Sequence, residues 1–200
     1  MKKIFILFVV VSAVLISCGT PEVQRVDART QTDLSGYWND TDVRIVCRSL
    51  INDCLTSPRV NQAIAARGGR TPTVVVGRFR NESSEHIDTA IISSIMEMEI
   101  FNSGRLNFVA GGDVREELRA ERQGQQAHAS ERTAAAIGNE TGADFMLTGS
   151  VRTIIDREGN QTARTYFVTA ELTNIETNER LWIGQNSEIK KIITRPSNRP

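Results

Sequence analysis

Two cysteines in the body of this 200-residue chain, Cys47 and Cys54, are its first candidates for redox or metal chemistry. They stand seven residues apart, on one face of a predicted helix. Two helical turns separate their Cα atoms by roughly 10.5 Å, whereas a disulfide requires less than about 7 Å. No histidine stands near them in the sequence, which argues against a metal site. The spacing therefore predicts two separate, buried thiols.

Acid–base catalysis would need a convergent set of side chains, and the two histidines give no sign of one. His86 stands among acidic residues at a predicted helix start, and His128 lies in a glutamine-rich segment, so both are predicted to be solvated. Gly111-Gly112-Asp113 could bind an anion, but a helix cap explains it fully. The chain contains no G-x-S-x-G, H-E-x-x-H or P-loop motif. We expect no enzyme, cofactor, metal or small-molecule substrate.

The charge balance narrows the classes of partner. Basic and acidic residues number 24 each, and no basic stripe is present. This balance argues against a nucleic-acid partner. After the N-terminal segment, no apolar run is long enough for a membrane-spanning helix.

The first 17 residues have the pattern of an export signal. Lys2 and Lys3 precede an apolar run that is shorter than the roughly 20 residues needed to span a bilayer. The run ends in Leu15-Ile16-Ser17-Cys18, which resembles the lipobox of bacterial lipoproteins. That resemblance implies cleavage before Cys18 and lipidation of its thiol, with an uncleaved anchor as the alternative. Gly19 then implies outer-membrane sorting, by resemblance to the Gram-negative rule, with the protein facing the periplasm.

The remaining chain is long enough for one domain. Residues 18–34 are polar, contain Pro21 and predict a flexible tether that reaches at most about 50 Å. Residues 35–194 are predicted to form a single globular α/β domain, and residues 195–200 a C-terminal tail. Such a domain needs no disulfide for stability.

Helical spacing predicts five helices in the first part of this domain. The first begins near Asp40 or Thr41, which could cap it, and the second runs from Ser57-Pro58 to Gly68-Gly69. The third covers 86–103, and two more start with an Asp113–Glu116 capping box and at Ser130, the last ending near Glu140. The buried side of the first helix is expected to comprise Val43, Val46, Cys47, Leu50 and Cys54. That of the third is expected to comprise Ile87, Ile91, Ile92, Ile95 and Met98.

Strand patterns dominate the C-terminal third. Short strands are predicted at 73–76 and 106–109, and long ones at 144–155, 162–175 and 180–192, with turns at 158–160 and 176–179. We expect an α/β fold: a small mixed β-sheet with helices packed mainly on one face and a C-terminal antiparallel meander.

Alternation along the long strands predicts two unlike faces. The face under the helices is expected to carry Phe145, Leu147, Val151, Ile155, Val168, Ala170, Leu172, Leu181, Ile183 and Ile189. The opposite face is polar with isolated large side chains, which favours a partner surface, although loops or a second subunit could also cover it. Its predicted partner-binding residues are Met146, Thr148, Ser150, Arg152, Phe167, Thr169, Glu171 and Trp182.

Four segments together resemble the LpoB family of penicillin-binding protein activators. They are Ser35–Asp42, Gly77–Ser83, Glu140–Ser150, and Leu172-Thr173-Asn174 followed by Thr177 and Leu181-Trp182. The resemblance implies an outer-membrane lipoprotein that binds a class A penicillin-binding protein and stimulates peptidoglycan synthesis. It also implies that the strand carrying Thr148 and Ser150 contributes to the partner surface.

The short tether departs from the long, proline-rich tether of the best-known family members. Two other functions stay open on the sequence. One is a lipoprotein subunit of a curli-type secretion channel, which would need additional lipid-facing strands that we do not find. The other is a generic periplasmic scaffold.

Overall fold

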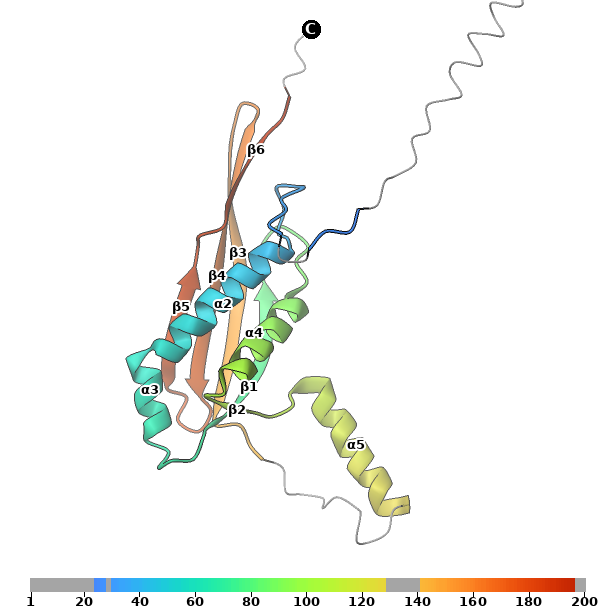
Figure 1. Cartoon of the computed structure of the whole chain (residues 1–200), viewed down its shortest axis with the longest axis vertical. Coiled ribbons are helices and arrows are strands. Elements are labelled where there is room, and N and C mark those ends of the chain that lie inside the picture. Colours follow the sequence, from blue (N-terminus) through green and yellow to red (C-terminus); the bar gives the residue numbers. More distant parts are fainter. Residues whose placement is uncertain (1–23, 28–29, 129–140, 197–200) are drawn as a thin grey trace, which may run out of the picture. The chain divides into compact units, whose positions relative to one another are not determined.

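The computed structural model describes residues 24–27, 30–128 and 141–196 (Figure 1). The predicted export signal, Cys18 and the predicted helix at 130–140 lie outside the described residues. The chain divides into two compact units, Met1–Gln31 and Thr32–Pro200. The fold below is that of the second unit.

Six strands form one mixed sheet in the second unit. They are β1 (Thr73–Asn81), β2 (Asn107–Phe108), β3 (Phe145–Glu158), β4 (Gln161–Asn174), β5 (Arg180–Asn186) and β6 (Lys190–Thr194). The order is β2-β1-β3-β4-β5, and β6 pairs with a separate stretch of β4. β1 is parallel to β2 and β3, and all other pairs are antiparallel. The predicted fold class, with its C-terminal antiparallel meander, is confirmed.

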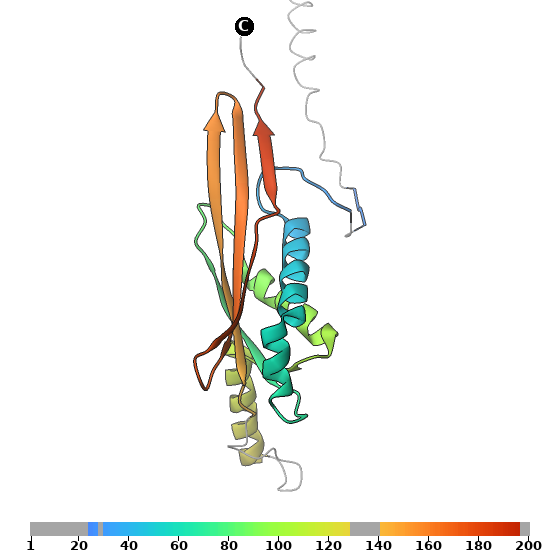
Figure 2. The same ribbon diagram turned by 90° about the vertical axis from the view of Figure 1, so that its left-hand side faces the viewer.

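The described helices are α2 (Asp40–Thr56), α3 (Pro58–Ala65), α4 (Thr89–Ser103) and α5 (Gly112–His128). Figure 2 shows the sheet nearly edge-on, with α2 and α4 along one side of it. None of the described helices lies on the other side. We call the first side the covered face and the second the open face.

The first helix follows its predicted periodicity but is capped one residue earlier than expected. Asn39 accepts a hydrogen bond from the Asp42 backbone N–H at 3.1 Å, and the Asp42 carboxylate accepts one from the Asn39 backbone N–H at 3.0 Å. This reciprocal capping box satisfies two backbone donors, so α2 begins at Asp40. The predicted buried side is confirmed, and both of its thiols are free and buried.

The third predicted helix is shorter and is turned differently from the expectation. Asp88 caps α4 by accepting from the Ala90 backbone N–H, so the helix starts at Thr89. Ile92, Met96 and Ile100 are buried. The assignment of Ile91 and Met98 to the buried side was wrong, since they are 50% and 51% exposed. This helix is apolar on all sides, so spacing alone could not select the side that faces the sheet.

Three smaller expectations also change. Ser57 makes no side-chain cap bond, and α3 ends at Ala65, before the two glycines. Glu116 pairs with Arg119 at 2.6 Å, and α5 already begins at Gly112, so no Asp113–Glu116 box starts it. The predicted strand 180–192 is two strands, because the chain leaves β4 after Asn186 and returns as β6.

Candidate partner-binding face

Strands β3 and β4 bring most of the predicted partner-binding residues together. Thr148 lies directly opposite Glu171, and Arg152 directly opposite Phe167. Ser150 and Thr169 form another such pair, and Met146 lies one pair further along β3. Directly opposed residues share a face of the sheet, so all of these side chains belong to the open face.

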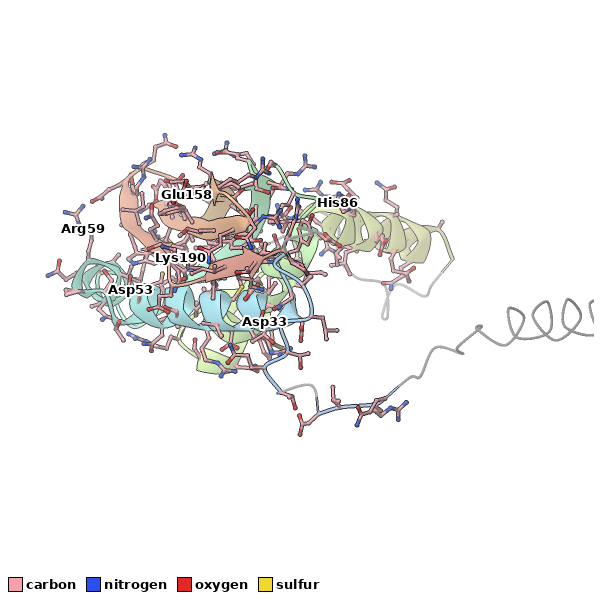
Figure 3. All side chains as sticks on the ribbon, turned by 90° about the horizontal axis from the view of Figure 1, so that it is seen from above. Asp33, Asp53, Arg59, His86, Glu158 and Lys190 are labelled. Carbon is pink, nitrogen blue, oxygen red and sulfur yellow. The ribbon has the colours of Figure 1, made fainter. Side chains whose placement is uncertain are left out.

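Trp182 does not lie on the open face. A bulge in the β4–β5 ladder sets Trp182 opposite Leu172, a buried residue of the covered face. Its indole N–H donates to an Asp53 carboxylate oxygen at 2.8 Å, on the same side of the sheet as α2 (Figure 3). The prediction for Trp182 was therefore wrong, because one extra residue in β5 reverses the alternation.

Ile183 takes the place expected for the tryptophan. It lies opposite Glu171 and is 56% exposed, so its predicted assignment to the buried face was also wrong. Met146 is 39% exposed, Phe167 is half-buried, and Ser150 is buried. The open face thus keeps large apolar side chains in contact with solvent.

Arginines concentrate along one side of the open face. Arg152 donates to Glu82 at 2.6 Å, and Arg80 pairs with the same carboxylate group at 3.2 Å. Arg78 is a third, exposed arginine beside them. A groove of about 580 Å³ runs between these side chains and β4. It has more guanidinium groups than carboxylates along the β1–β3 side, so it favours acidic partners.

The contribution of β1 was missed from the sequence. Arg80 lies beside Ser150 because β1 pairs in parallel with β3, across a segment of more than sixty residues. β1 has a bulge of one extra residue between Val76 and Phe79. Because of this bulge, Phe79 points to the covered face and the arginines lie on the open face. Alternating Arg78-Phe79-Arg80 was the available signal, but the partner strand could not be read from it.

A network of buried charges on the covered face was also missed. The Lys191 ammonium donates to Asp42 at 2.6 Å, and both side chains are nearly inaccessible. The Tyr166 hydroxyl donates to Glu85 at 2.9 Å, and Arg164 pairs with the same carboxylate. Burial and the Glu85 hydrogen bond raise the pKa of Tyr166. These groups pair with each other and are covered, so we assign them a structural role.

Among the described side chains, the candidate nucleophiles and bases do not form a reacting set. Burial raises the pKa of both Cys47 and Cys54 to about 12, so both thiols are neutral near pH 7. His86 is exposed, as predicted, and the His128 side chain lies outside the described residues. Within the described part of the chain, no three His, Cys, Asp or Glu side chains cluster as metal ligands. None of the described helices is long and apolar enough to cross a bilayer.

Comparison with known proteins was made for the sequence and for the fold. The family model described as peptidoglycan-synthase activator LpoB matches residues 42–188. No curated protein sequence matches the chain. Two similar solved structures are the LpoB C-terminal domains of Salmonella enterica and Escherichia coli. The first is 15% identical, with 77% of this chain and 99% of that one covered at a TM-score of 0.43. The second is 16% identical, with 72% and 96% covered at a TM-score of 0.44.

The structure of lipoprotein GNA1162 from Neisseria meningitidis is also similar, at 17% identity and a TM-score of 0.40, with 64% of this chain and 88% of that one covered. The match to the family model spans most of the folded unit, including all of β1 to β5. This chain belongs to the LpoB family of peptidoglycan-synthase activators.

Proposed function

We propose that this protein is an outer-membrane lipoprotein that binds and activates a class A penicillin-binding protein from the periplasmic side. Lipid on Cys18 anchors it, residues 18–34 form the tether, and the domain at 35–194 carries the activity. The family match over residues 42–188 is the observation that carries this proposal.

The open face is the docking surface in this proposal. Its exposed apolar side chains, Met146 and Ile183, are surrounded by polar and charged groups, which is the composition of a protein interface. Docking there favours the active conformation of the synthase, because a partner shifts an equilibrium toward the state that it binds better. The domain itself then needs no catalytic side chains.

A matched pair of variants tests the surface. Ile183→Asp places a charge on the open face, and Ile91→Asp places the same charge on the outer side of α4, at similar exposure. We expect Ile183→Asp to weaken binding to the purified synthase at least tenfold and to abolish stimulation of glycan polymerisation. Ile91→Asp should keep both.

Two results would contradict the proposal at different levels. Equal binding by both variants would exclude the open face as the docking surface. No change in polymerisation rate when the wild-type protein is added to synthases of its own organism would exclude activation altogether. Far-ultraviolet circular dichroism of both variants separates loss of binding from loss of folding.

A further inference from the structure

The chain between β2 and α5 reaches the sheet on the side of the open face. A Cβ added at Gly111 would lie 2.9 Å from Val75 Cγ2. Val75 stands beside Met146 in the parallel β1–β3 pair, so its side chain points to the open face. Gly111 therefore lies at the edge of β1 beside an open-face side chain, while Gly111 to Asp113 also line a hollow with α4.

The structure does not pack α5 on the open face, but the handedness rule for strand connections favours this side for it. The connection from β1 to β2 carries α4 on the covered face. The connection from β2 to β3 carries α5 and runs across the sheet in the opposite direction, past β1. Connections between parallel strands are right-handed in about 98% of cases. The β2–β3 connection crosses the sheet in the direction opposite to the β1–β2 connection. If both are right-handed, their helices lie on opposite faces, so α5 belongs on the open face.

The side chains of α5 match the groove on the open face. Asp113, Glu117 and Glu121 recur every four residues and form an acidic ridge. Val114 and Leu118 follow on the adjacent ridge and are 55% and 44% exposed. None of the described side chains in α5 is buried, so the structure leaves uncovered an apolar seam with the acidic ridge on one margin and Arg115 and Arg119 on the other.

The length of α5 is compatible with a position along β3 in the groove of the open face. A 17-residue helix is about 25 Å long, equivalent to about eight residues of strand. Starting at the level of Met146, it would extend along β3 to about Ile154. Residues 129–144 then have to return to the start of β3, and this segment can span about 50 Å when extended.

We propose that the groove between β1, β3 and β4 on the open face is a docking site for an amphipathic helix with an acidic ridge beside its apolar seam, and that α5 of the same chain binds there. Val114 and Leu118 then pack against Met146 and Thr148, and the acidic ridge lies beside the arginines. One consequence rests on the function proposed above: α5 must leave the groove before a synthase binds there.

Disulfide trapping in the full-length protein, purified in detergent without any synthase, tests this contact. Leu118→Cys is combined with Thr148→Cys on the open face, and in the matched control with Ile91→Cys on the outer side of α4. Peptide mapping identifies the cysteines joined, and the buried Cys47 and Cys54 stay unreactive because of their raised pKa. We expect the first pair to form an intramolecular disulfide at least tenfold faster than the control pair.

Equal rates in the two pairs would overturn the proposal, as would disulfides formed mainly between two molecules. Val114→Cys with Met146→Cys is a second pair that should also react, in case Thr148→Cys disturbs β3. Glu117→Lys should slow trapping, because it places a cation beside the arginines. Because no synthase is present, failure here leaves the proposed function standing, whereas failed activation of the synthase leaves this contact standing.

Discussion

The covered and open faces of one sheet are built from the same strands, yet they obey different constraints. On β3, Phe145, Leu147 and Val151 are fully buried under the helices. The open-face residues that alternate with them include exposed Met146 and Arg152, the arginine of an exposed ion pair. Close packing selects side chains by volume on the first face. Exposed apolar groups and clustered arginines on the second face are not explained by packing among the described residues, and this contrast supports the proposal that the face binds a partner.

The largest expected effect comes from truncating matched phenylalanines on the two faces. Phe145→Ala empties a fully buried site and should lower the free energy of unfolding by about 3–5 kcal/mol. Phe167→Ala removes a half-buried ring and should cost only about 1 kcal/mol. Urea unfolding of both variants measures the difference, and equal losses would abolish the distinction between the faces.

The buried network of the covered face should produce the next largest effect. Tyr166→Phe removes the hydroxyl that donates to Glu85 and leaves a buried carboxylate without one of its partners. We expect a loss of about 1–3 kcal/mol in unfolding free energy. Thermal unfolding gives the value. A loss below about 0.5 kcal/mol would show that the network does not stabilise the fold.

Acid should lower the stability of the fold by protonating Asp144, which directly precedes β3. The Arg70 hydrogen bond holds the pKa of Asp144 below its usual value, and the Thr73 backbone N–H also donates to this carboxylate. A lowered pKa means that this contribution is present above about pH 3.9 and is lost as the pH falls through the folded-state value. Asp144→Asn should therefore reduce the fall in melting temperature between pH 6 and pH 3. An unchanged fall would exclude Asp144 as a source of acid sensitivity.

The smallest effect on stability should come from the arginines of the open face. Arg152 is largely exposed and its partner Glu82 is partly exposed, and ion pairs at the surface contribute about 0–1 kcal/mol. Arg152→Gln should therefore leave the unfolding free energy almost unchanged while weakening binding to the synthase. A loss of stability as large as that of Tyr166→Phe would mean that this arginine serves the fold.

Much of the architecture was determined by local sequence. The spacing of Val43, Val46 and Leu50 predicted the buried side of α2, and the alternation in β3 and β4 predicted which residues share the open face. These patterns are local because a helix or strand repeats its geometry every few residues. The α/β class followed from the order of these elements.

Three features were decided only by the tertiary structure. They are which residues of β5 lie on each face of the sheet, which side of α4 is buried, and which strands pair with β1. A single bulge exchanged Trp182 and Ile183 between the faces. The parallel pairing of β1 with β3 added Arg78 and Arg80 to the candidate site. Local spacing fixes which side chains of one element point the same way, but strand register and helix orientation depend on contacts between residues distant in the sequence.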